Sequence, residues 1–209
     1  KLFSINLNIK GHCDKRTAAK PRIIVSNHLS YLDIFVVSSV APSVFIASVD
    51  EVREDMLLGT IAGLAGTQFI ERRTRAKIRE EIGSATEILM MNRIIALFPE
   101  GTTSDGSGVL PFKTPFFSMA EQEDSIVQPL CIKYSSIAGV PVTHENRDLV
   151  YFYGDMKFLP HFRKLFAIKS VDVEITFLKP VHSQGMSRKE IADCAYRTIT
   201  EEYSADCRV

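Results

Sequence analysis

A run of five apolar residues at positions 94–98 places the strongest constraint on how this chain can fold. Such an uninterrupted run predicts a strand buried on both faces, as in a mostly parallel sheet. Pro99 ends the ladder because it has no N–H to donate, and Gly101 permits close backbone approach or a positive φ. The loop that follows holds the carboxylate of Glu100 and three hydroxyls. Open α/β sheets bind ligands at this end of a strand, although the same residue types also form ordinary turns.

Strands and helices alternate along the rest of the chain. Apolar runs and period-two alternation predict strands over residues 3–9, 23–26, 44–47, 68–71, 94–98, 126–134, 149–153 and 171–178. Apolar residues at helical spacing predict helices over residues 30–40, 74–91, 116–121, 160–166 and 188–203, with helical turns between 51 and 64. This alternation predicts an α/β fold: a single-domain sandwich with a mixed, mostly parallel central sheet flanked by helices.

Size and composition fit one globular domain over residues 1–209, with 45% hydrophobic and 24% charged residues. The formal net charge is zero, so no global basic field points to nucleic acid as a partner. The cysteines show no paired metal-ligand spacing and no dense disulfide pattern, which predicts a reducing compartment and no metal site. They are Cys13, Cys131, Cys194 and Cys207.

A membrane-spanning helix is not predicted, because no segment reaches the roughly 20 apolar residues that a bilayer requires. One long uncharged run covers residues 56–70 and is broken by three glycines. This run can pack in the core or lie in a membrane interface. The chain opens at Lys1 without a methionine, so an N-terminal membrane anchor absent from this chain is an expectation.

The segment after the strand at 23–26 places His28 five positions before Asp33, which falls in the first turn of the next helix. Five steps along a helix separate two side chains by about 140°, so they can meet only if His28 precedes the helix. A histidine oriented by a carboxylate acts as a general base near neutral pH. The structural alternative is a helix cap, because Ser30 and Asp33 have capping-box spacing.

These segments, in this order, resemble the glycerolipid acyltransferase family, which includes bacterial 1-acylglycerol-3-phosphate acyltransferases. His28 and Asp33 match the family's signature of a histidine, four residues and an aspartate. Residues 69–72 (Phe-Ile-Glu-Arg) match its second block, residues 98–102 (Phe-Pro-Glu-Gly-Thr) its third, and residues 126–130 resemble its fourth. The motif-bearing core runs from about residue 21 to 134, and the similarity is weaker beyond it.

The resemblance implies an O-acyltransferase that moves a fatty acyl group from acyl-CoA or acyl carrier protein to a lysolipid hydroxyl. His28 would take the proton from that hydroxyl, and Asp33 would hold the imidazole in the right tautomer. Ser30 is a rival candidate, as the nucleophile of an acyl-enzyme. A hydrolase that uses the same pair on water, and a non-catalytic lipid-binding protein, are the other readings.

Further site residues are expected on the neighbouring blocks. The guanidinium of Arg72 can clamp a phosphate or carboxylate, unless Arg72 simply opens a solvated charge run. Lys113 can reach a phosphate of the acyl donor, unless it too is only solvated. The expected acceptor-binding residues are Arg72, Glu100, Gly101 and Thr102. No metal or resident cofactor is expected, and the protein is expected to be peripheral or anchored at the cytoplasmic face of a membrane.

The resemblance favours 1-acylglycerol-3-phosphate as the acceptor, to give phosphatidate. Two positions depart from the family pattern: Val49 stands where many relatives carry lysine, and Met56 where proline is common. The missing cation weakens the expectation of a phosphate headgroup. Residues 151–156 and 159–161 also resemble the branch that acylates lyso-ornithine lipid, whose acceptor carries a hydroxy fatty acid and an amino-acid head. Lyso-ornithine lipid is therefore the alternative acceptor.

Overall fold

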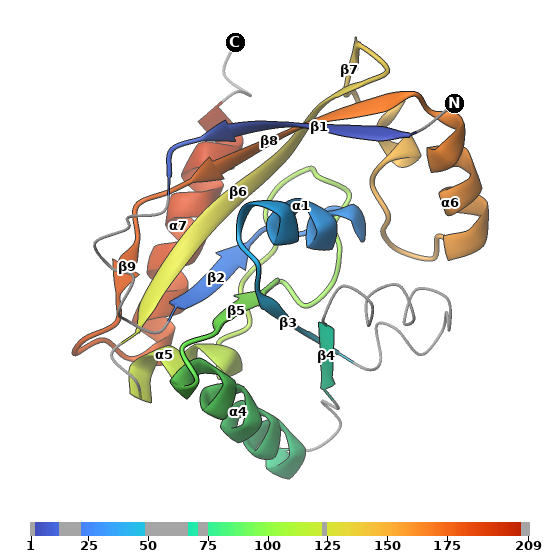
Figure 1. Ribbon diagram of the computed structural model, residues 1–209. Helices are drawn as coiled ribbons and strands as arrows, with labels where there is room; N and C mark the ends of the chain where they lie inside the picture. Colours follow the sequence, from blue (N-terminus) through green and yellow to red (C-terminus); the bar gives the residue numbers. More distant parts are fainter. Residues whose placement is uncertain (1–2, 13–21, 49–66, 71–74, 123–124, 206–209) are drawn as a thin grey trace.

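The computed structural model describes residues 3–12, 22–48, 67–70, 75–122 and 125–205, which build helices around one sheet (Figure 1). In these residues the sheet has nine strands. They are β1 (Ser4–Lys10), β2 (Arg22–Ser26), β3 (Val44–Ser48), β4 (Thr67–Ile70), β5 (Ile94–Leu97), β6 (Ile126–Ile137), β7 (Val140–Pro141), β8 (Ser170–Phe177) and β9 (Val181–His182). The strand order is β1-β8-β6-β2-β5-β3-β4, with β7 and β9 paired to β6.

Most neighbouring strands run parallel. β6, β2, β5, β3 and β4 form a continuous parallel series. β8 runs antiparallel to β6, and β1 adds to the outer side of β8 in parallel. The mixed, mostly parallel sheet expected from the sequence is therefore confirmed.

Helices cover both faces of the sheet. They are α1 (Leu32–Val40), α4 (Arg75–Met90), α5 (Ser118–Gln122), α6 (Phe158–Ala167) and α7 (Arg188–Ala205), with 3-10 turns η2 (Pro115–Phe117) and η3 (Arg147–Leu149). Ile24 and Ile132 belong to the core under α1 and α6, whereas their neighbours Ile23 and Cys131 belong to the core under α4, α5 and α7. Successive strand residues point to opposite faces, so a strand between two helical layers must be apolar throughout. Figure 1 shows α1 and α7 on opposite faces.

The strand expected at residues 149–153 is wrong. Residues 147–149 form η3, and residues 150–153 belong to no strand. The N–H groups of Val150 and Tyr151 both bond to the carbonyl of Arg147, and that of Phe152 bonds to the carbonyl of Leu29. The run is apolar because it covers α1: Val150 is fully buried, and the Phe152 ring contacts Tyr31 edge-on. A short apolar run cannot by itself distinguish a strand from a covering loop.

The other expected elements agree within about three residues with those observed, the usual uncertainty at element ends. The short strands β7 and β9 were not expected, because two residues carry no periodicity. The helical turns expected between 51 and 64 lie outside the described residues, as do Val49 and Met56. Among the helices that the structure describes, none is both long enough and apolar enough to cross a bilayer.

Candidate active site

His28 and Glu100 meet because they follow neighbouring parallel strands. β2 and β5 pair with Val25 opposite Leu97, so the loops after both strands leave the same edge of the sheet. The backbone N–H of His28 donates to Glu100 Oε1 over 2.7 Å. The carbonyl of His28 accepts the N–H of Ser104 over 2.9 Å. The loops after β2 and β5 are therefore joined at His28 itself, at the strand ends where open α/β sheets bind ligands.

Asp33 holds the His28 ring from the start of α1. Its Oδ2 lies 2.8 Å from His28 Nδ1, and the same oxygen accepts the N–H groups of Leu29 and Ser30 over 2.7 Å and 2.9 Å. The carboxylate is fully buried, whereas the His28 side chain is 13% exposed. A carboxylate that accepts from Nδ1–H leaves the lone pair on Nε2, which is the form a general base requires.

The Asp33 carboxylate therefore both orients His28 and caps the start of the helix, the two roles that the sequence suggested as alternatives. The bond from Ser30 N–H to Asp33 is the one that the third helical residue makes in a capping box. The other half of the box differs: Ser30 Oγ accepts the N–H of Leu32 at 3.4 Å, and the N–H of Asp33 donates to the Ser30 carbonyl instead. Helix α1 begins at Leu32, not at residue 30. Ser30 is fully buried, which speaks against its rival role as a nucleophile.

Tyr134 and Phe98 complete the surroundings of the pair, and sequence reasoning gave neither a role there. Tyr134 lies in β6 and donates its hydroxyl hydrogen to Asp33 Oδ1 over 2.6 Å. Burial, followed by the charge of Asp33, raises the pKa of Tyr134 well above its usual value, so this hydroxyl stays a donor. The Phe98 ring stacks on the His28 ring with centroids 3.9 Å apart. Stacking on Phe98 thus fixes the plane of the imidazole, and the bond to Asp33 prevents the ring from flipping.

Asn27 ties the loop to the sheet. Its side-chain amide donates to the carbonyl of Ile132 over 2.9 Å, and its carbonyl oxygen accepts the N–H of Ile132 over 2.8 Å. The side chain thus continues the ladder between β2 and β6 by one step beyond Ser26. An asparagine beside a histidine at a strand end was the available signal, but it is common in loops.

Glu100 is expected from sequence to contact the acceptor, and its geometry favours a positioning role instead. It is 2% exposed, and each oxygen accepts a backbone N–H: Oε1 from His28 and Oε2 from Leu110 over 2.9 Å. Burial raises the pKa of Glu100 to about 7, opposed by these two hydrogen bonds. With both oxygens occupied, the carboxylate holds the backbone N–H of His28 and so positions the imidazole indirectly.

Gly101 and Lys113 fit against each other beside the pair. Gly101 has a φ of 70°, and a side chain there would overlap the Lys113 ammonium. The N–H of Lys113 donates to the carbonyl of Pro99 over 2.8 Å. Lys113 and Phe98 line a pocket of about 250 Å³, together with Ile46, Leu97, Pro99, Pro115 and Phe116. The pocket therefore extends from the His28-stacking ring to a cation, and the roles of Lys113, Gly101 and the exposed Thr102 stay predictions.

Arg72 lies outside the described residues, so its expected acceptor contact stays a prediction. The strand before it, β4, is not next to β5, because β3 pairs with both and lies between them. The strands that precede Arg72 and Glu100 are therefore not neighbours in the sheet. Within the ranges that the structure describes, no group of three histidine, cysteine, aspartate or glutamate side chains is arranged to hold a metal ion.

Known proteins resemble this chain in sequence and in fold. The family model described as Acyltransferase matches residues 8–133. A lyso-ornithine lipid O-acyltransferase from Brucella abortus (strain 2308) is 38% identical over 188 residues, covering 87% of this chain and 69% of that protein. A namesake from Rhizobium meliloti (strain 1021) is 32% identical over 91% of this chain and 67% of that protein. A 1-acyl-sn-glycerol-3-phosphate acyltransferase from Neisseria gonorrhoeae is 30% identical over 75% of this chain and 58% of that protein.

Among solved structures, the 1-acyl-sn-glycerophosphate acyltransferase from Thermotoga maritima superimposes with a TM-score of 0.63 at 20% identity. The match covers 98% of this chain and 73% of that chain, and it shows a common fold. The sequence matches go further, since the family model spans more than half of the chain and includes His28, Asp33 and Glu100. The chain therefore belongs to the acyltransferase family.

Proposed function

We propose that this enzyme is a lysolipid O-acyltransferase in which His28 is the general base and lyso-ornithine lipid is the acceptor. The observation that carries the proposal is the His28–Asp33 pair, whose 2.8 Å contact orients the imidazole at the ligand-binding edge of the sheet. A positioned general base contributes roughly 10²–10⁴ to a rate. No protein nucleophile is needed, because the acceptor hydroxyl attacks the acyl thioester itself.

The proposed reaction passes one proton through His28. His28 Nε2 takes the proton of the acceptor hydroxyl while the hydroxyl oxygen forms a bond to the thioester carbonyl carbon. Asp33 stabilises the imidazolium that results, and Tyr134 and two backbone N–H groups keep the carboxylate in place. The tetrahedral intermediate collapses with cleavage of the C–S bond, and the imidazolium gives the proton to the leaving thiolate, which departs as the free thiol.

The choice of acceptor is supported by similarity and by position. Similarity to the Brucella protein, at 38% identity over 87% of the chain, exceeds similarity to the Neisseria protein, at 30% over 75%. Residues 151–156, which carry the likeness to the lyso-ornithine branch, lie beside the catalytic loop. The N–H of Phe152 donates to the carbonyl of Leu29 over 2.9 Å, next to His28. Because residues 151–156 lie next to His28, their sequence can influence which acceptor binds there.

1-Acylglycerol-3-phosphate is the second candidate acceptor. The Neisseria relative supports it, and Lys113 is a described cation that lines the pocket beside Phe98. A cation at this position suits a phosphate, either on the acceptor or on the acyl donor. The proposed acyl donor is acyl-CoA or acyl carrier protein.

The test is acyl transfer by the purified protein. Each donor is paired with lyso-ornithine lipid, with 1-acylglycerol-3-phosphate and with no acceptor, and products are identified by mass spectrometry. The expected result is ornithine lipid formed faster than phosphatidate, with little free fatty acid when acceptor is omitted. The His28→Ala protein gives the background rate. Free fatty acid released equally with and without acceptor would replace the transferase with a hydrolase.

A further inference from the structure

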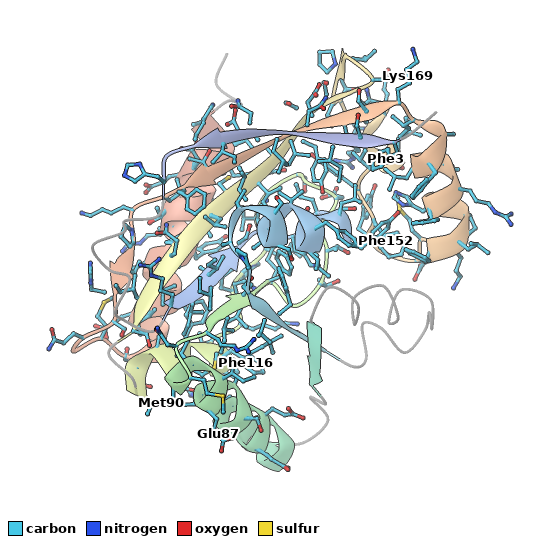
Figure 2. The ribbon with its side chains drawn as sticks, in the orientation of Figure 1. Phe3, Glu87, Met90, Phe116, Phe152 and Lys169 are labelled. Carbon is cyan, nitrogen blue, oxygen red and sulfur yellow. The ribbon has the colours of Figure 1, made fainter. Side chains whose placement is uncertain are left out.

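Helix α6 leaves large apolar side chains in water. Phe158 and Leu165 are buried, whereas Leu159 and Phe166 are 46% and 55% exposed. Leu159, the half-buried Phe162 and Phe166 are three and four residues apart, so they follow one flank of the helix. The Phe162 and Phe166 rings lie 4.4 Å apart. Phe3, which Figure 2 labels, extends the line, with its ring 5.6 Å from that of Phe166. We call these four side chains the α6 ridge: Phe3, Leu159, Phe162 and Phe166.

Positive charge surrounds the α6 ridge. Arg163 and Lys164 are exposed on the helix itself, and Lys157 and Lys169 are exposed at its two ends. Residues 156–171 contain no aspartate or glutamate, although the whole chain has a formal net charge of zero. An apolar strip bordered by lysine and arginine has the chemistry of a helix that lies in the interface of an anionic membrane.

The α6 ridge and the catalytic loop share one edge of the sheet. β8 begins just after α6 and runs antiparallel to β6, which is itself parallel to β2. The beginning of β8 therefore lies on the side of the sheet toward which β2 runs, opposite Ile137, which follows the Ser26 partner Leu130 along β6. Phe3 precedes β1, which is parallel to β8, and so comes to the same edge.

The buried side of α6 packs directly on the catalytic loop. His161 Nδ1 lies 3.0 Å from the hydroxyl of Tyr31, the residue between Ser30 and Leu32. The Phe158 ring meets the Tyr31 ring edge-on at 5.1 Å. Anything that binds the exposed flank of α6 is therefore separated from Tyr31, and from the loop that carries His28, only by the helix itself.

We propose that the α6 ridge docks on an anionic lipid bilayer and thereby turns the His28 edge of the sheet toward the membrane. Leu159, Phe162 and Phe166 enter the boundary between headgroups and acyl chains, and Arg163 and Lys164 contact anionic headgroups. The purpose of this docking rests on the proposed function, because the acceptor is a lipid. The test of docking is independent of that function, since binding to vesicles is measured without turnover.

The apolar part is tested with vesicles of phosphatidylcholine mixed with phosphatidylglycerol, using flotation of the full chain. Leu159→Asp/Phe166→Asp is expected to lower the partition coefficient at least ~10-fold, because apolar contacts are replaced by charges that the anionic surface repels. The matched control is Met90→Asp/Met91→Asp, since these methionines are 65% and 70% exposed on another face. Figure 2 shows Met90 on α4, far from Phe3. Circular dichroism establishes that each variant is folded.

The electrostatic part uses Arg163→Gln/Lys164→Gln. Each lost cation is expected to weaken binding about fivefold, but only on vesicles that contain phosphatidylglycerol and not on phosphatidylcholine alone. The exposed pair Arg188 and Lys189 at the start of α7 gives the matched control, Arg188→Gln/Lys189→Gln. Equal loss in both double variants would reduce the effect to net charge and overturn the assignment to α6.

The docking inference and the proposed function can fail independently of each other. Vesicle binding by folded Leu159→Asp/Phe166→Asp that equals the wild type overturns the inference, and so does a wild type that binds no vesicles. A wild-type dimer in light scattering that this variant converts to a monomer assigns the ridge to a second copy and also overturns it. Binding that depends on α6, with no acyl transfer to acceptor in detergent micelles, keeps the inference and rejects the proposed function.

Discussion

The loop of residues 27–33 buries polar groups, whereas α6, at the same edge of the sheet, exposes apolar ones. Asn27 is 1% exposed and Asp33 0%, and every oxygen of these two side chains accepts a hydrogen bond. Phe166 is 55% exposed. A buried carboxylate is tolerated only when its hydrogen bonds are made, so the loop has one geometry. A contiguous strip of half-exposed apolar side chains, by contrast, marks a surface suited to contact with another molecule or a membrane.

The largest effect is expected from His28→Ala. It removes the proposed base and should lower acyl transfer roughly 1,000-fold. The free energy of unfolding should fall by only about 1–2 kcal/mol, because mainly the Phe98 stacking and one hydrogen bond are lost. Steady-state rates with lyso-ornithine lipid and urea denaturation measure the two quantities. Near-normal turnover by a folded variant would remove His28 from catalysis.

Asp33 should affect both activity and stability. Asp33→Ala leaves the N–H groups of Leu29 and Ser30 and the Tyr134 hydroxyl without their acceptor, so the free energy of unfolding should fall by about 3–5 kcal/mol. Asp33→Asn is the matched variant. Its amide oxygen can serve the backbone donors while its nitrogen faces Tyr134, so it should be the more stable of the two and still lose about 10²-fold or more in rate. Equal stability in urea would contradict the proposed hydrogen-bond network.

Glu100 makes the stability of the loop depend on pH. Because burial raises its pKa from 4.5 to about 7, the folded state binds a proton more tightly than the unfolded state. Its contribution is fully present below the unfolded pKa and is lost as pH rises through about 7, a change on the order of 3 kcal/mol. Between about pH 5 and about pH 8, the wild type should therefore lose stability relative to Glu100→Gln. Glu145→Gln, at an exposed position, is the control, and parallel profiles for all three proteins would contradict the raised pKa.

Tyr134→Phe should have a smaller effect, because Asp33 keeps its other donors. Turnover should fall about 10-fold and the free energy of unfolding by about 1 kcal/mol. The control is Tyr196→Phe, which removes a hydroxyl that donates to the carbonyl of Val109 over 3.2 Å, away from Asp33. A change in KM for the acceptor with kcat unaltered would argue for a binding role in place of a positioning one.

The smallest effect is expected where the two regions touch. His161→Phe and Tyr31→Phe each break the contact between the Tyr31 hydroxyl and His161 Nδ1. A double-mutant cycle should give a coupling energy of about 0.5–1.5 kcal/mol in urea denaturation. Turnover should fall no more than severalfold, because neither side chain touches Asp33. A coupling energy of zero would mean that α6 and the catalytic loop respond independently.

The sequence determined the alternating elements and the pairing of His28 with Asp33. The apolar run at 94–98 has to be buried on both sides, which requires a parallel sheet between two layers. The motif pair is local, five residues apart, so a strand followed by a helix is enough to bring the two side chains together. The same reasoning failed at 149–153, because an apolar loop that covers α1 has the composition of a strand.

Tertiary structure alone decided what holds the pair in place. Tyr134 is 101 residues from Asp33, and Glu100 is 72 residues from His28, and no periodicity links either pair. They meet because β6 and β5 both lie against β2, and strand order depends on packing over the whole sheet. The exposed flank of α6 was equally hidden, because periodicity identifies a helix but does not say which apolar side chains the rest of the fold will cover.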